Sequence, residues 1–250
     1  MSIYRDPEKI CDYLLNWLKE QFGASGIRGA VVGISGGIDS SLLAGLLCRA
    51  LGPDNVIGVI MPCHSQPIDE EYALLLADKF KFKVEKIDLT DVYDTCLSAL
   101  ASGEKSLAVL PSANIKPRLR MITLYAIAQQ HGYLVCGGGN KDEITYGYFT
   151  KYGDSGVDIL PLADLLKGEV RLAAKYIGVP NEIIERAPTA GLWNGQTDES
   201  EMGITYDELD NYIATGKASP DIKEKIDKAS RRSEHKRKFA VAAVIPKDIK

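Results

Sequence analysis

The chain has 250 residues, of which 45% are hydrophobic and 26% charged, and its formal net charge is −4. These values are ordinary for a folded globular protein, and they exclude a disordered chain, a collagen and a disulfide-dense mini-protein. The length fits one α/β domain over residues 1–250, and the acidic balance predicts no nucleic-acid partner, which a basic chain would favour.

In chain order, the first predicted element is a helix that Asp6 caps, Pro7 begins and Gly23 ends. Short apolar runs and helical spacings then alternate along the chain. The later elements are predicted as strand 29–34, helix 40–50, strand 55–61, helix 69–82, strand 84–89, helix 112–131, strand 133–136 and helices 164–177, 206–216 and 221–238. Continuous apolar strands that alternate with helices are typical of a parallel sheet covered on both faces.

Two segments, 103–117 and 188–205, contain long irregular stretches. Loops of that length inside a compact domain are often lids or binding loops. We therefore expect both segments to order when substrate binds.

Cysteine usage and the N-terminus indicate the compartment. The five cysteines have no CxxC pair and no zinc-like spacing, and an odd count of this kind predicts reduced thiols in a cytoplasmic protein. The N-terminus lacks the apolar core of a signal peptide, and no run reaches about 18 apolar residues, so we expect no membrane partner.

The turn after the first strand carries the strongest chemical signal. It reads Gly33-Ile-Ser-Gly-Gly-Ile-Asp-Ser40 and leads directly into a helix. Its glycines allow backbone N–H groups to approach an anion, and the following helix directs its positive end to the same place. The turn matches neither the dinucleotide nor the Walker pattern. Because Asp39 would repel bare phosphates, a carboxylate here predicts Mg²⁺ between them.

The string Ser35-Gly-Gly-Ile-Asp-Ser40 resembles the pyrophosphate loop of the N-type ATP pyrophosphatases, which bind ATP, adenylate a substrate and release pyrophosphate. Several further strings are similar to one branch of that family, the NAD synthetases, and they occur in the family's order. They are Asn114–Met121, Gly147–Asp154, Asp158–Leu162, Ala187–Glu199 and His235–Arg237. The resemblance covers about residues 5–245. It implies a five-stranded, Rossmann-like parallel sheet with helices on both faces.

The resemblance also implies a set of ATP contacts. Asp39, Glu143 and Lys167 would be the catalytic residues, with Asp39 and Glu143 holding Mg²⁺ and with Lys167 and Thr189 on the ATP phosphates. The loop residues that would cradle the pyrophosphate are Gly33, Ile34, Ser35, Gly36, Gly37, Ile38, Asp39 and Ser40. One position departs from the family, because Gly138 stands where a threonine often contacts ATP. Backbone or water contacts would substitute for the missing hydroxyl.

A second set of residues aligns with the deamido-NAD contacts of the family: Arg118, Lys151, Asp158, His235 and Lys236. Arg118 offers a planar fork suited to phosphate or carboxylate. His235 and Lys236 lie in a basic stretch, residues 223–250, which has ten Lys/Arg against four Asp/Glu. By contrast, residues 196–210 hold six carboxylates and no Lys or Arg. We interpret this charge bias as a mark of a dinucleotide site.

The implied reaction is the amidation of deamido-NAD by ammonia, with ATP as co-substrate and an NAD-adenylate as intermediate. AMP and pyrophosphate would be released in this last step of NAD biosynthesis. The chain shows no spare length for a glutaminase domain and no Cys/His arrangement typical of one, so free ammonia is the predicted donor. The family is typically homodimeric, which predicts a homodimer here.

Two other functions remain open on the sequence. One is another ATP pyrophosphatase, such as a GMP synthetase fragment, although no additional dimerisation domain is visible. The other is a regulatory module that binds ATP without turnover. The paired carboxylates and the second set of substrate residues argue against this module, since an ATP sensor needs no second site.

Overall fold

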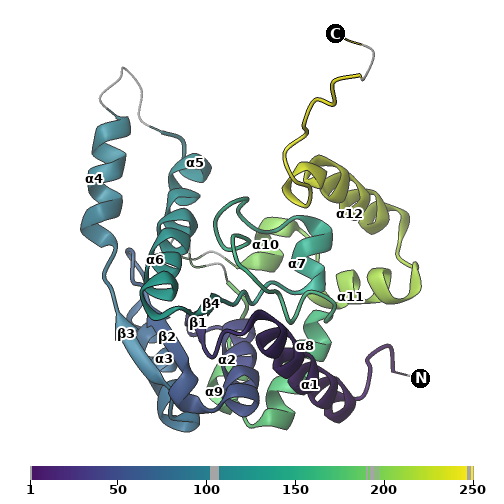
Figure 1. The fold of residues 1–250 in the computed structure, drawn as a ribbon. Coiled ribbons are helices and arrows are strands. Elements are labelled where there is room, and N and C mark those ends of the chain that lie inside the picture. The colour runs from purple at the N-terminus through teal and green to yellow at the C-terminus, as the bar shows by residue number, and fades with distance from the viewer. Residues whose placement is uncertain are drawn as a thin grey trace.

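The computed structural model describes residues 2–101, 107–189, 191, 195, 197–246 and 249. Its centre is a parallel sheet with the strand order β3-β2-β1-β4 (Figure 1). The strands are β1 (Ala30–Gly33), β2 (Val56–Ile60), β3 (Lys83–Lys86) and β4 (Leu134–Val135). The chain therefore has the predicted α/β class.

The described sheet has four strands, so the prediction of five was wrong in count. The place of a fifth strand is taken by a single parallel bridge between Cys136 and Ile159. Around it, Gly137 N donates to Ile159 O at 2.9 Å and Asp158 N donates to Val135 O at 2.9 Å. Pro161 follows two residues after the bridge, and its missing N–H prevents the ladder from continuing.

Side chains on alternate strand residues enter two separate cores, as the pleat of a strand requires. Val32 and Ile60 pack in one core, whereas Val31 and Val59 pack in the other. The first core is covered by α1 (Pro7–Ser25), α2 (Ile38–Leu51), α3 (Pro67–Phe80) and α8 (Lys167–Ile177). The second is covered by α4 (Thr90–Leu100) and α6 (Ile115–His131).

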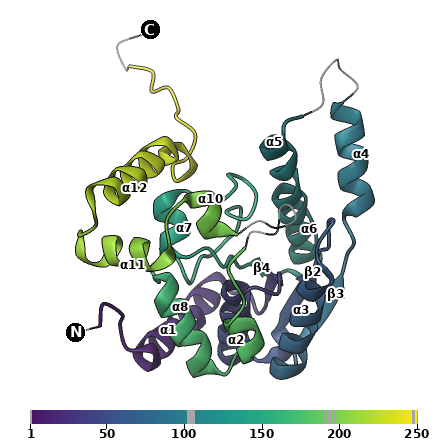
Figure 2. The same cartoon turned by 180° about the vertical axis from the view of Figure 1, so that it is seen from behind.

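A third, smaller core lies among helices outside the sheet. It is formed by Met202, Ile204, Tyr206, Leu209 and Ile226. The helices around it are α7 (Lys141–Tyr146), α10 (Asp198–Met202), α11 (Tyr206–Thr215) and α12 (Pro220–Arg232). Figures 1 and 2, seen from opposite sides, place α11 and α12 at one end of the molecule and α4 at the other.

Most predicted helices are confirmed with shifted ends. Asp6 does cap α1, since its side chain accepts hydrogen bonds from Glu8 N and Lys9 N, but the helix ends at Gly26 rather than Gly23. The predicted helix 221–238 ends at Arg232 and is followed by the short 3₁₀ helix η2 (Glu234–Lys236). Elements that were not predicted are α4, α7, α10, the short helix α9 (Asn181–Ile184) and the 3₁₀ helix η1 (Pro53–Asn55).

The predicted helix 112–131 is two helices. The helix α5 (Val109–Ala113) is followed by a one-residue turn at Asn114 before α6 begins. The break has a physical cause, because Pro117 has no N–H to donate to the carbonyl of Ala113 and is tolerated only in the first turn of a helix. Part of the first long segment is thus helical, and its residues 103–106 lie outside the described residues.

The second long segment is helical over α10, while its residues 190, 192–194 and 196 lie outside the described residues. All five cysteines are free thiols. Among the described helices, none combines the length and the apolar character needed to cross a membrane.

Candidate active site

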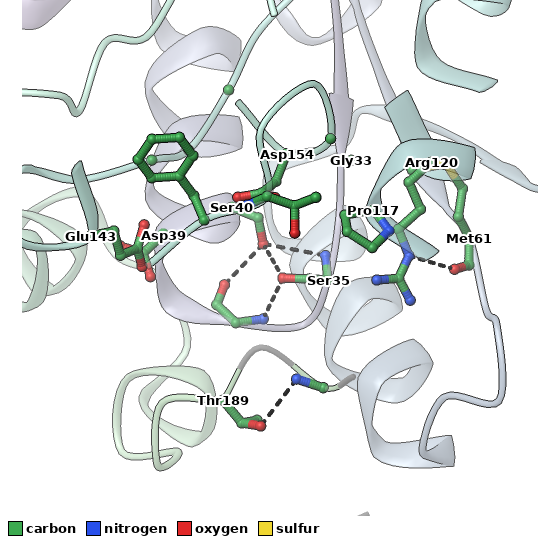
Figure 3. Close-up of a pocket in the computed structure, with 18 of the residues that line it drawn as sticks. Gly33, Ser35, Asp39, Ser40, Met61, Pro117, Arg120, Glu143, Asp154 and Thr189 are labelled. Atoms are coloured by element: carbon green, nitrogen blue, oxygen red, sulfur yellow. Dashed lines mark hydrogen bonds between the residues drawn. The ribbon is translucent and has the colours of Figure 1, made fainter. Parts of the chain in front are cut away.

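A cavity of about 700 Å³ opens where β1 and β2 end and the phosphate loop begins (Figure 3). Crevices beyond the carboxyl ends of parallel strands are where such sheets bind ligands. The predicted site residues that line it are Gly33, Ile34, Ser35, Gly37, Ile38, Asp39, Ser40, Glu143, Lys167, Thr189 and Lys236. The structure therefore brings all the predicted ATP residues except Gly36, and one predicted deamido-NAD residue, to one cavity.

The loop after β1 is held by its own serines. Ser40 Oγ donates to Gly37 O at 3.0 Å, and Ser41 Oγ donates to the same carbonyl at 2.8 Å. Gly37 caps α2 without any side-chain hydrogen bond, so the first N–H groups of this helix keep their capacity to donate to a ligand. The loop and helix together form an anion site of the kind that binds phosphates.

Gly36 turns away from the cavity and packs against the start of α3. Its φ of 74° is left-handed, and a Cβ there would lie 2.5 Å from the backbone oxygen of Asp69. Arg186 completes the contact, with Nη1 donating to Gly36 O at 3.3 Å and Nη2 pairing with Asp69 Oδ1 at 2.5 Å. Only glycine fits this position.

Beside the loop, a buried ammonium joins the two predicted metal ligands. Lys167 Nζ lies 2.5 Å from Asp39 Oδ2 and 3.8 Å from Glu143 Oε1. The Lys167 side chain is 2% exposed, and each carboxylate is 20% exposed. Three elements far apart in the sequence, α2, α7 and α8, therefore converge on one point.

The charges in this cluster do not balance, because Asp198 adds a third carboxylate near the lysine. Burial raises the pKa of Glu143 well above its usual value, and the charge of Asp39 raises it further. Burial also raises the pKa of Asp198. Burial opposes the charged form of Lys167, but Asp39 and Glu143 outweigh it, so the pKa of Lys167 is raised. The site is thus short of positive charge.

Asn140 orients both carboxylates, which the sequence analysis did not predict. Its Nδ2 donates to Asp39 Oδ1 at 2.9 Å, while its Oδ1 accepts from Glu143 N at 3.0 Å. Glu143 Oε2 in turn accepts from Asn140 N at 3.2 Å. This is a capping box at the start of α7. The Asn-x-x-Glu spacing was the available signal for it.

The residues present fit a magnesium ion. Asp39 and Glu143 already converge on one cation, and their mutual repulsion would fall if a divalent ion lay between them. Among the described residues no three His, Cys, Asp or Glu side chains form a metal cluster. Mg²⁺ is usually held by one or two carboxylates plus substrate phosphates and water, and Asp39 and Glu143 are two carboxylates that line this cavity.

Gly138 lines the same cavity. A Cβ added to it would lie 3.5 Å from the backbone carbon of Asp39, which is ordinary contact. A small side chain at this position would therefore fit against the phosphate loop without a clash.

The predicted deamido-NAD residues divide into three places. Lys236 Nζ donates to the carbonyl oxygens of Gly147 and Phe149 at 2.8 and 2.7 Å, at the edge of the cavity. A chain of contacts links three others, since Arg118 Nη2 donates to Lys151 O at 3.2 Å and Lys151 Nζ donates to His235 O at 2.7 Å.

Asp158 lies apart from these residues, at the end of β4. Its Oδ2 accepts from Val135 N at 2.8 Å, and its Oδ1 accepts from Tyr125 OH at 3.1 Å. The structure thus gives Asp158 a local role in fixing the end of β4.

Sequence reasoning also missed Arg186, Asp198 and Arg120, which line the cavity. Arg120 lies within a quoted motif, and its Nε donates to Met61 O at 3.2 Å (Figure 3). Arg186 and Asp198 flank or belong to the Ala187–Glu199 string, but no local pattern shows which partners they meet. Their contacts depend on how α3 and α11 pack.

Together, the sheet and the cavity define an α/β protein with a helix N-terminus beside paired carboxylates, an arrangement suited to a polyphosphate. Comparison with known proteins identifies the family. The NAD synthase model matches residues 10–240, and the chain belongs to that family.

Three relatives define the likeness further. A protein of Finegoldia magna named NH(3)-dependent NAD(+) synthetase is 50% identical over 232 residues, which are 93% of this chain and 94% of that protein. The structure of an NMN synthetase from Francisella tularensis is similar, with a TM-score of 0.92 and 37% identity over 97% of this chain and 100% of its own. An NH3-dependent NAD synthetase from Campylobacter jejuni, in complex with nitrate, has a TM-score of 0.80 and 26% identity over 96% and 100% of the two chains.

The geometry of Gly36 yields a mutational prediction. We expect Gly36→Ala to lower the free energy of unfolding by about 1–3 kcal/mol, because the new Cβ meets a backbone oxygen and the φ is left-handed. Mg-ATP affinity, measured by calorimetry, should fall as well. Gly138→Ala is the matched control, since its Cβ has room, and it should melt near wild type. Wild-type melting and Mg-ATP affinity in Gly36→Ala would show that the loop tolerates a side chain at Gly36.

Proposed function

We propose that this chain amidates the nicotinate carboxylate of deamido-NAD with ammonia, at the expense of ATP. The carboxylate attacks the α-phosphate of ATP, so pyrophosphate leaves and an NAD-adenylate forms; ammonia then displaces AMP and leaves the amide. The observation that carries the proposal is the 50% identity, over nearly the whole of both chains, to a protein named NH(3)-dependent NAD(+) synthetase. ATP is accordingly the co-substrate.

The chain's own residues supply positioning and charge neutralisation, which dominate phosphoryl and nucleotidyl transfer. The N–H groups at the start of α2 would hold the leaving pyrophosphate. Lys167 and Thr189 would contact the phosphates, with Lys167 already directed at Asp39. Asp39 and Glu143 would hold Mg²⁺, which when bound screens the anionic carboxylate from the anionic phosphates.

The proposed deamido-NAD contacts are Arg118, Lys151, Asp158, His235 and Lys236. Four of them lie outside the main cavity. Arg118, Lys151 and His235 lie together on α6, in the turn after α7 and on η2, whereas Asp158 lies at the end of β4. We propose that a second copy of the chain completes this part of the site. The support is an exposed apolar surface on α5 and α6, where Val109, Leu110 and Ile122 are 70%, 53% and 59% exposed, since exposed apolar patches often mark interfaces.

A cytoplasmic location and free ammonia as nitrogen donor belong to the same proposal. The free cysteines support the first. The names of the relatives that match nearly end to end support the second.

A second candidate substrate is the mononucleotide, nicotinate mononucleotide, which the same amidation would convert to NMN. A specific observation favours it, because the Francisella tularensis NMN synthetase superposes with a TM-score of 0.92 against 0.80 for the Campylobacter jejuni NAD synthetase. The two candidates share the adenylation chemistry and differ only in whether the substrate carries an adenylate half.

Pyrophosphate release decides between the candidates. The pure chain with Mg-ATP and ammonium should release pyrophosphate when deamido-NAD is added, and kcat/KM for deamido-NAD should exceed that for nicotinate mononucleotide. The opposite ranking would make the chain an NMN synthetase. Turnover with XMP alone would refute both, and glutamine-dependent turnover would refute ammonia as the donor.

The metal assignment predicts the effect of Asp39→Asn. This near-isosteric change removes one of the two carboxylates that converge on the cation, so kcat should fall by at least about 100-fold and the requirement for Mg²⁺ should rise. Asp91→Asn is a matched control, because Asp91 also lies in the first turn of a helix but is exposed. Near-normal turnover of Asp39→Asn at low Mg²⁺ would contradict the assignment.

The assembly can be tested by light scattering. We expect the mass of a dimer at working concentration and a shift towards monomer for Ile122→Glu, because a charge at a buried apolar contact is unfavourable. Arg118 lies one helical turn away on the same face, so the shift should be accompanied by a higher KM for the nicotinate substrate. A wild-type monomer with full activity would contradict the shared site.

A further inference from the structure

The first turn of α8 is held by hydrogen bonds from outside its own segment. Lys167 N donates to Asp142 Oδ2 at 2.9 Å and to Asp210 Oδ1 at 3.0 Å. Gly168 N donates to Asp210 Oδ2 at 2.9 Å. Helix N-termini leave such N–H groups without intrahelical partners, and here two carboxylates from α7 and α11 take them.

The N-terminal segment of the chain reaches the same point. Tyr4 OH donates to Asp210 Oδ2 at 2.9 Å, so this carboxylate oxygen receives both a phenol and an amide. A Cβ added to Gly168 would lie 2.3 Å from the Tyr4 ring, which shows that the ring rests directly on the backbone of α8. Asp210 is fully buried and cannot exchange these partners for water.

Arg5, the next residue of the N-terminal segment, binds the first turn of α8 as well. Arg5 Nη2 pairs with Glu169 Oε2 at 2.6 Å, and Arg5 N donates to Glu169 Oε1 at 2.9 Å. Glu169 Oε2 also accepts from Leu166 N at 3.1 Å, which closes the turn that contains Lys167. The backbone of Lys167 is therefore fixed on both sides.

These contacts matter because the backbone position of Lys167 determines where its ammonium group lies beside the phosphate loop. Its Nζ lies 2.5 Å from Asp39 and 4.9 Å from the centre of the Tyr206 ring, and Tyr206 begins the helix that carries Asp210. Both ends of the lysine thus depend on α11. A shift of about 1 Å in such a group is enough to cost a large factor in rate.

We propose that Asp210 and Tyr4 act as positioning residues for Lys167, so that the N-terminal segment and α11 together set the reach of the catalytic lysine. The inference rests on the proposed function in assigning Lys167 to the ATP phosphates. It adds two residues that are far apart in the sequence and do not line the cavity.

The test removes one tyrosine hydroxyl and compares the effect with that of removing a second tyrosine hydroxyl that does not contact α8. Tyr4→Phe deletes the bond to Asp210, whereas Tyr212→Phe deletes a tyrosine–aspartate bond of the same kind, to Asp227 Oδ1 at 2.8 Å, which does not involve α8. Both tyrosines are half-buried, but Asp210 is fully buried and Asp227 is not. Tyr4→Phe should therefore lower Tm more than Tyr212→Phe does, and the kinetic constants, not Tm, test the positioning role.

We expect Tyr4→Phe to lower kcat and to raise the Kd for Mg-ATP, each by about tenfold, which is the order of one hydrogen bond to a charged group. The KM for the nicotinate substrate should stay unchanged, and Tyr212→Phe should keep wild-type values. Asp210→Asn should reproduce the Tyr4→Phe pattern with a larger loss, if it folds. In a Lys167→Met background, Tyr4→Phe should have no further effect on Mg-ATP affinity.

Equal kinetic effects in Tyr4→Phe and Tyr212→Phe, or a Tyr4→Phe effect that persists in the Lys167→Met background, would overturn the positioning role. Failure of the proposed function is a separate result, because it would appear as wild-type chain that turns over neither nicotinate nucleotide. The Mg-ATP titrations still test the positioning in that case.

Discussion

A buried ammonium keeps its charge only if carboxylates stay beside it, and the active site is arranged around this constraint. Lys167 is 2% exposed, with Asp39 and Glu143 as its partners. Breaking a buried pair by removing one partner typically costs about 3–5 kcal/mol, because the other charge is left uncompensated. The three residues lie in the first turns of three different helices. Each helix must therefore begin at the right place for the buried charges to compensate one another.

Buried ion pairs are weak evidence for a contribution to stability, because desolvation offsets most of the attraction. Here the cluster also has more carboxylates than cations, and burial together with Asp39 raises the pKa of Glu143. A core built only for stability would not accumulate like charges. An excess of negative charge at an anion-binding loop is explained when a cation accompanies the anion, as Mg²⁺ accompanies nucleotide phosphates.

The order of the strands explains why distant residues meet. Because β1 and β4 are neighbours, the loop that follows β1 and the loop that follows β4 leave the sheet side by side. The first loop brings Asp39, and the second brings Asn140 and Glu143. Asn140 joins the two loops by donating to Asp39, and it accepts from Glu143 N within its own loop. In a parallel sheet both loops emerge at the same edge, so the site follows from the topology.

Much of this could be predicted from sequence, because it depends on short strings. The phosphate loop is a local pattern, Glu143 and Lys167 were assigned through the family resemblance, and the structure places all of them on one cavity. Local patterns do not give the partner of a side chain. Arg186 binding Gly36, Asn140 binding Asp39 and Tyr4 binding Asp210 span between 101 and 206 residues, and such contacts are fixed only by packing. The four strands predicted from apolar runs are all present. The fifth strand, which only the resemblance implied, is reduced to a single bridge that a proline follows two residues later.

The two candidate substrates would be distinguished by residues outside the main cavity. The ATP cavity would serve either substrate, because adenylation of a nicotinate carboxylate needs the same phosphate loop, carboxylates and lysine. In the proposed assignment the adenylate half is contacted outside that cavity by Arg118, Lys151 and His235, which are linked by hydrogen bonds from side chains to backbone carbonyls. Arg118 shares a helix face with the exposed Ile122, so that part of the site adjoins the apolar surface. Recognition of the larger substrate and association with a second copy would therefore depend on one surface, formed by α6, whereas the chemistry depends on the loops after β1 and β4.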